Sequence, residues 1–546
     1  MVGGGFFLLH LLSFFVFFVL SDGLVYVFYF GGLDLFYYVF NFVFYFDLIS
    51  VVFFSVIMLI SFVVFFYINF YMGEMLKFWR FYWMVFFFVV SMVLLVFSPN
   101  LFSVIVGWDG LGITSFLLVC FYDDLVSFFS SLVVFFSNRL GDGLLLISFS
   151  AFMAVGDVDY YYFGSELGFL FAFFLFLVFF TSSAQYPFMV WLPLAMAAPT
   201  PVSSLVHSST LVTAGVYLVI RFYVFLVDFF GFAFVRWFSL VTFFFAGLLG
   251  VSEMDLSSVI AFSTLSQLGM MFYICSLGLY FYSYMLLLYH ALYKSLLFLV
   301  FGYLMKVCFG SQDGRFLGVS FLDYPFLLVI LFLSGGSLFG MPFLAGFYVS
   351  DLVFSFLVFF DVAFLEILIF FFGCVFTFVY SLSIFKFVYF MWFSGGVYFF
   401  VSVDWWVFFV LLYLSLYSVF FGGYFSDYVC SDLFVMLYGF ESVLPVVVLF
   451  FAVFFFVFCF YFVYWGGVFW GSFFYLYYFV YEFWAYVFDR LFYFVVSDMT
   501  WVEFFVWSGF VSLKSFMLVD LMVFINYYVG VSLMFMFMLV FGFLVM

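Results

Sequence analysis

Long apolar runs, separated by short polar breaks, recur along the whole chain. A helix needs roughly 20 mostly apolar residues to cross a bilayer, and about 15–16 runs of that kind can be separated here. The pattern therefore predicts an all-α polytopic membrane protein. The predicted spans are centred near residues 13, 36, 59, 87, 110, 135, 178, 213, 241, 265, 290, 331, 372, 411, 453 and 537.

Two of the apolar segments are interrupted by helix-breaking residues. Residues 181–221 hold half of the 8 prolines of the chain, namely Pro187, Pro193, Pro199 and Pro201. Residues 334–351 combine four glycines with Pro342. A broken helix at membrane depth is tolerated where protein or a water-filled cavity covers the freed backbone. The other interpretation of the proline segment is a loop between two packed helices. Paired broken helices are typical of transporters with inverted repeats, which would here occupy 101–240 and 255–390.

The composition supports the membrane class and indicates where the gene resides. Only 7% of the residues are charged and 71% are hydrophobic, whereas soluble domains average roughly 25% charged. The 114 Phe residues have T-rich codons, while Lys, His, Pro and other residues with A- or C-rich codons are rare. Such a base bias is typical of an organellar genome, so we expect a mitochondrially encoded protein. The alternative, selection for aromatic packing, does not explain the shortage of Pro and Thr. The six cysteines are far apart without a CxxC pair, so no metal or iron–sulfur site is predicted.

Several ionisable residues lie inside apolar runs, where an unpaired charge is costly and therefore a functional candidate. They are Asp109, Asp142, His207, His290, Lys294 and Asp351. His290 and Lys294 are four residues apart, which places them on one face of a helix. For Arg139 and Asp142, in NRLGD, a structural ion pair is an equally open interpretation.

The C-terminal segment differs from the rest of the chain. Residues 470–526 are aromatic but also carry acidic and basic residues, which is too charged for one span and too apolar for a soluble domain. A lateral amphipathic helix fits this composition. We expect N-terminal transmembrane helices over 1–100, a core with both broken segments over 101–393, further transmembrane helices over 394–469, and a last one over 527–546.

The chain from Asp47 onward resembles the family of NADH dehydrogenase subunit 5, the distal antiporter-like subunit of respiratory complex I. The sister subunits 2 and 4 resemble it more weakly. The segments that carry the resemblance are FDLIS (46–50), YINFYMGE (67–74), GWDGLG (107–112), NRLGD (138–142), WLPLAMAAPTPVSSLVHSSTLVTAG (191–215), VIAFSTLSQLGMM (259–271), HALYK (290–294) and AGFYVSD (345–351).

The resemblance implies roles for the candidate residues. Asp109 takes the place of the proton-channel Glu of the family, and Asp142 that of a further membrane acid. His207 lies on the half-channel helix that follows, His290 and Lys294 match the central relay, and Asp351 matches the acid on the exit side.

Three departures concern the charges of that path. Ser182 and Ser350 stand where the family has lysines, and Asp109 is one methylene shorter than Glu. We therefore expect Asp109 to lack a cationic partner and Ser182 and Ser350 to hold water instead.

The resemblance implies a core subunit of complex I that translocates protons as NADH is oxidised and ubiquinone reduced. It implies no cofactor in this chain, since NADH, FMN, iron–sulfur clusters and ubiquinone are bound by other subunits. The implied partners are subunits 4 and 2, accessory subunits and lipids of the mitochondrial inner membrane, with no nucleic acid. Two alternatives remain: the large subunit of a cation/proton antiporter, and a structural clamp that no longer pumps.

Overall fold

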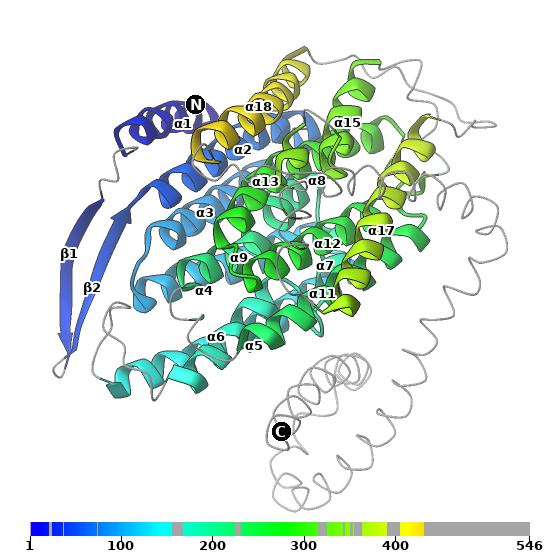
Figure 1. The fold of residues 1–546 in the computed structure, drawn as a ribbon. Helices are drawn as coiled ribbons and strands as arrows, with labels where there is room; N and C mark the ends of the chain where they lie inside the picture. The colour runs from blue at the N-terminus through cyan, green and yellow to red at the C-terminus, as the bar shows by residue number, and fades with distance from the viewer. Residues whose placement is uncertain are drawn as a thin grey trace, which may run out of the picture. The chain divides into compact units, whose positions relative to one another are not determined.

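The computed structural model describes one compact unit of this chain, which lies within Met1–Phe456. Figure 1 shows its helices and two strands in colour. The described residues are 2–430 except 21–24, 36–37, 74, 156–167, 224–225, 227–230, 309, 315–324, 342–343, 350–352, 354–356, 358–362 and 390–404. The spans predicted near residues 453 and 537 and the lateral helix at 470–526 lie outside the described residues, as does much of the region 394–469.

Ten helical segments of the described part are long and apolar enough to cross a membrane. Eight are single helices: α2 (Leu48–Met72), α3 (Phe78–Phe97), α5 (Leu125–Val155), α11 (Gly231–Ser252), α12 (Leu256–Ser276), α13 (Tyr280–Val307), α17 (Phe364–Tyr389) and α18 (Trp405–Cys430). The ninth is α4 (Leu101–Val119) with the 3-10 turn η1 (Cys120–Tyr122) that continues it. The tenth is the composite segment Thr200–Arg221. Three further apolar helices are α1 (Val2–Leu20), α6 (Gly168–Ser182) and α15 (Pro325–Leu338). Each lies at a predicted centre, so the multi-pass membrane fold is confirmed.

The span predicted near residue 36 is wrong, because this segment forms an antiparallel hairpin. β1 (Tyr26–Leu35) pairs with β2 (Tyr38–Phe46), and the register shifts at the two glycines between Phe30 and Leu33. Aromatic and β-branched residues favour strands, and paired glycines favour a bulge over a continuous helix. Counting apolar residues alone does not separate these two structures.

The proline-rich segment is broken where the sequence predicts. After α6 ends at Ser182, short pieces follow before a regular helix resumes: α7 (Trp191–Leu194), η3 (Ala195–Ala197), α8 (Thr200–Val202), η4 (Ser203–Thr210) and α9 (Leu211–Arg221). η4 is a π-helix, at whose end the Leu211 N–H donates to the Val206 carbonyl five residues earlier. At the second predicted break, α15 ends at Leu338 and Gly340 has a φ of 76°.

The helix α13 is the most enclosed span together with the segment Thr200–Arg221, and the apolar stretch of both is fully buried. It contacts α2, α8, η4, α9, α12, α15 and α18. Figure 1 shows α13 in the midst of these helices. The broken segment and α13 therefore form the most buried part of the described unit.

Candidate functional site

Two ionisable residues lie on one face of α13 in its buried stretch. His290 and Lys294 both have no exposed surface. The Lys294 ammonium donates a hydrogen bond to the hydroxyl of Ser263 on α12. The ring of His290 packs edge-on against Tyr293, with 5.7 Å between the centroids. Neither nitrogen of His290 has a hydrogen-bond partner among the described residues.

His207 lies in the π-helical η4, which packs against α13. The residue is fully buried, and its ring centroid lies 6.3 Å from that of Trp191. The backbone of Ala195 approaches the imidazole, but without the geometry of a hydrogen bond. π-Helical turns are frequent at functional sites because they displace side chains from their α-helical positions. The break thus places an imidazole beside the helix that carries His290 and Lys294.

Ser182 ends α6 in the interior, where the related family has a lysine. It is 5% exposed, and its hydroxyl donates to the Phe179 carbonyl of its own helix at 3.1 Å. The opposite helix approaches so closely that a Cβ at Gly215 would lie 2.5 Å from the Ser182 oxygen. A small residue at 182 and a glycine at 215 therefore belong to one tight helix contact.

Asp109 does have a cationic partner, so the expectation that it lacks one is wrong. Nη1 of Arg139 lies 3.8 Å from its carboxylate and 2.8 Å from that of Asp142. The indole of Trp108 donates to the other oxygen of Asp142 at 2.9 Å. Asp109 and Arg139 have 44% and 41% of their side chains exposed in this chain, whereas Asp142 has 13%. Asp109 is therefore neither fully desolvated nor without a counter-charge.

Two glycines of the GWDGLG motif bring α4 against α3. A Cβ at Gly107 would lie 2.8 Å from the Leu95 backbone nitrogen, and one at Gly110 would lie 2.8 Å from Cβ of Ser91. Small residues at such spacing let membrane helices approach closely. The motif therefore fixes the helix on which Asp109 lies.

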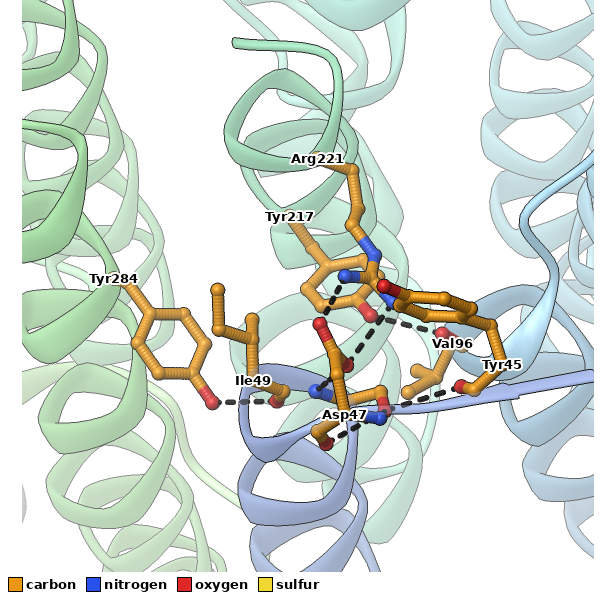
Figure 2. Close-up of polar contacts among 8 residues, drawn as sticks. Tyr45, Asp47, Ile49, Val96, Tyr217, Arg221 and Tyr284 are labelled. Carbon is orange, nitrogen blue, oxygen red and sulfur yellow. Dashed lines mark hydrogen bonds and ion pairs between the residues drawn. The ribbon is translucent and has the colours of Figure 1, made fainter. Parts of the chain in front are cut away.

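A second ion pair joins distant helix ends, as Figure 2 shows. Asp47 caps α2 by accepting from the Ser50 N–H, and both guanidinium ends of Arg221 bind its carboxylate at 2.5 and 3.2 Å. The Arg221 guanidinium also lies over the Tyr45 ring. Tyr217 donates to the Val96 carbonyl at the end of α3, and Tyr284 to the Ile49 carbonyl.

The structure thus brings His207, His290 and Lys294 onto two packed elements, and Asp109 and Asp142 around Arg139. Asp351 and Ser350 lie outside the described residues. Sequence reasoning did not predict Ser263 as the partner of Lys294, nor Arg139 as a cation shared by two carboxylates. The i, i+3 spacing of Arg139 and Asp142 was a local signal for half of that cluster.

The comparison with solved structures shows the fold. A chain of the Mrp complex from Dietzia sp. is similar over 82% of this chain and 52% of its own, with a TM-score of 0.70 and 21% identity. A chain of the membrane-bound sulfane sulfur reductase, an archaeal respiratory membrane complex, is similar over 81% of this chain and 92% of its own, with a TM-score of 0.69 and 18% identity.

Sequence relatives point to the same group of proteins. NADH-ubiquinone oxidoreductase chain 5 of Locusta migratoria is 42% identical over 313 residues, which are 56% of this chain and 54% of that protein. The chain 5 protein of Mytilus edulis is 42% identical over 285 residues, 52% of this chain and 50% of its own. The chain thus spans about half the length of the curated relatives it matches. The sequence pattern of a membrane-protein family matches residues 98–377, just over half of the chain, and the chain belongs to that family, NADH:quinone oxidoreductase/Mrp antiporter.

Proposed function

We propose that the chain is a core membrane-arm subunit of complex I that translocates protons while NADH is oxidised and ubiquinone is reduced. The observation that carries the proposal is the buried pair His290 and Lys294 on α13 beside the π-helical turn with His207. Ionisable groups inside a membrane are costly and mark ion or proton paths. The similarity to curated chain 5 proteins supplies the redox reaction to which the path is coupled.

The buried groups divide the work by their charge and position. Lys294, hydrogen-bonded to Ser263, holds or releases a proton in the interior. His290 and His207 accept and pass it on, because an imidazole can bind a proton at one nitrogen and release one from the other. In the cluster of Asp109, Arg139 and Asp142, two carboxylates share one guanidinium. A change in the charge of one carboxylate therefore changes the pairing of the other, which links the proton path to charges nearby. For Asp351 and Ser350 the roles implied by resemblance, at the exit side, remain part of the proposal.

The surroundings follow from the same proposal. The protein lies in the mitochondrial inner membrane beside subunits 4 and 2, accessory subunits and lipids. The redox groups, NADH, FMN, iron–sulfur clusters and ubiquinone, are bound by other subunits. Residues 470–526 lie along the neighbouring subunits as a lateral helix, a role that their aromatic and charged composition supports.

The test uses the intact complex that contains this chain, reconstituted into vesicles. We expect NADH oxidation to acidify the vesicle interior, and Lys294→Met to reduce the number of protons moved per NADH. Lys77→Met is the matched control, because Lys77 is exposed and pairs with Asp123 at a helix end. Purification of the chain without NADH-oxidising subunits, with proton movement driven by a sodium gradient instead, would establish the antiporter alternative. Unchanged proton counts in Lys294→Met would establish the structural clamp.

A further inference from the structure

One face of α3 is exposed over the first half of the helix. Arg80, Trp83, Phe87 and Val90 are exposed and follow one another at intervals of three or four residues, which places them on one side of the helix. We call these four residues the α3 stripe. Trp83 and Phe87 have half or more of their surface exposed, and their ring centroids lie 6.2 Å apart. With a rise of 1.5 Å per residue, the stripe is about 15 Å long.

The second half of α3 is covered by the chain itself. Every residue from Ser91 to Phe97 is buried or half-buried. The Phe97 ring centroid lies 4.5 Å from that of Phe46 on β2 and 5.0 Å from that of Phe54 on α2. The hydrocarbon core of a bilayer is roughly 30 Å thick, so the exposed stripe has the height of one leaflet. A membrane span of a partner would meet a face as long as the whole core, whereas a lipid molecule covers one leaflet.

The polar end of the stripe carries a cation without an ion-pair partner. Arg80 forms no ion pair with any residue that the structure describes, while Lys77 is hydrogen-bonded to the carboxylate of Asp123. Arg80 adds a weaker electrostatic attraction at Asp123, and Asp124 beside it is exposed as well. Two cations and two carboxylates therefore balance each other here, but the guanidinium of Arg80 remains open to a further anion.

The residues beside Arg80 are typical of the level of lipid head groups. Trp79 is 70% exposed and Trp83 is 50% exposed. Tryptophan is enriched where the apolar core of a membrane meets water, and long cationic side chains extend toward that boundary. Phe87 and Val90 follow farther into the apolar run. The order along the helix is thus a cation, then tryptophan, then apolar side chains, which matches the order of groups in a phospholipid.

We propose that the α3 stripe binds one phospholipid with a zwitterionic head group, whose phosphate pairs with Arg80 and whose acyl chain lies along the rest of the stripe. The balanced charge at this helix end favours a head group that carries an ammonium beside its phosphate. A lipid with surplus negative charge would be repelled by Asp123 and Asp124, whose charges exceed what Lys77 alone neutralises. The site depends on the membrane fold alone and goes beyond the proposed function.

The experiment uses the intact complex that contains this chain, stripped of lipid and reconstituted into phosphatidylcholine vesicles. A small share of the phosphatidylcholine carries a photoreactive diazirine on an acyl chain, and mass spectrometry of peptides locates the label. We expect label between Trp83 and Val90, and about fivefold less in Arg80→Gln, because one basic residue near a membrane surface contributes about that factor. Arg80→Lys keeps the charge and should keep most of the label. Trp406→Ala removes an exposed tryptophan of α18 and is the control that should leave labelling of α3 unchanged.

Four outcomes would overturn the proposal. Equal labelling of the unmodified chain and Arg80→Gln would show that Arg80 does not hold the phosphate. Stronger labelling by phosphatidylglycerol with the same diazirine would contradict the zwitterionic head group. Loss of the label on addition of inorganic phosphate would indicate a site for the free ion, and a density map with a protein chain along the stripe would indicate a subunit contact. The proton counts of Lys294→Met are independent of all four outcomes, so the proposed function is tested separately.

Discussion

The guanidinium of Arg139 lies 3.8 Å from the carboxylate of Asp109, on the neighbouring helix α4. Asp142 lies closer, at 2.8 Å, so one cation serves two acids. The cation that Ser182 does not supply thus comes from a different helix. This arrangement replaces the charge-free site expected around Asp109.

Replacing Arg139 tests this shared cation. With Arg139→Gln the two carboxylates face each other without a counter-charge, which favours protonation of one of them. We expect proton transfer to slow roughly tenfold, which corresponds to ~1.4 kcal/mol on the barrier. Arg139→Lys keeps the charge and is expected to retain more of the rate. The measurement is the initial rate of vesicle acidification with NADH, and equal rates for both variants would contradict the role of charge.

Ser182→Lys tests whether a lysine at position 182, where the family has one, can pair with Asp109 in this chain. Because Gly215 and Ser182 are in tight contact, a long side chain here has to displace the opposing helix. We expect Ser182→Lys in the Arg139→Gln background to lower assembly rather than rescue proton transfer. The amount of assembled complex on a native gel reports the first effect. Recovery of the acidification rate to that of the unmodified chain would show that the lysine reaches Asp109 after all.

The ion pair between Asp47 and Arg221 is expected to contribute to stability. Their side chains are only 16% and 17% exposed, and hydrogen bonds to charged groups are worth about 1.5–3 kcal/mol each. Asp47→Asn keeps a side-chain oxygen that caps α2 but loses the charge, and Arg221→Gln loses the other partner. The thermal midpoint of the purified complex should fall in each single variant, with less than additive loss in the double variant. Additive losses would mean that the two residues act independently.

Lys77 and Asp123 provide the comparison, since they form an exposed ion pair. Lys77 lowers the pKa of the Asp123 carboxyl, mainly through its hydrogen bond. A carboxyl with a lowered pKa stabilises the fold above its unfolded pKa, and that contribution is lost as the pH falls through the lowered value. Exposed pairs contribute little, so Lys77→Gln should leave the thermal midpoint at neutral pH unchanged.

Gly107→Ala is expected to destabilise the contact between α3 and α4. Its Cβ would lie 2.8 Å from a backbone nitrogen of Leu95, which cannot rotate away. Overpacking of this kind costs typically 1–3 kcal/mol. Gly112→Ala is the control in the same helix, because there the nearest atom is 3.9 Å away. A thermal midpoint that falls equally in both variants would attribute the effect to the helix rather than to the contact.

The helices could be predicted from the sequence because their apolar runs have the length of a membrane span. The shared face of His290 and Lys294 could be predicted because it follows from helical periodicity. The hairpin at Tyr26–Phe46 was not, since an apolar count does not separate paired strands from a span. The contact between Arg221 and Asp47 joins residues 174 positions apart, and that of Arg139 with Asp109 depends on how α4 packs against α5. Pairings of this kind arise from tertiary packing and leave no local pattern.

The π-helical stretch η4 determines how the residues before it are rotated about the helix axis relative to α9. Its hydrogen bonds span five residues instead of four, so a turn there contains more of the chain than an α-helical turn. Arg221 is anchored at Asp47, and the C-terminal end of α9 is therefore the fixed pivot. Removing one residue from the π turn would rotate everything before it, Thr200 included, by about 100°, because an α-helix has 3.6 residues per turn. The Thr200 hydroxyl would then no longer lie on the side of the segment that contacts α13, while Arg221 stayed in place.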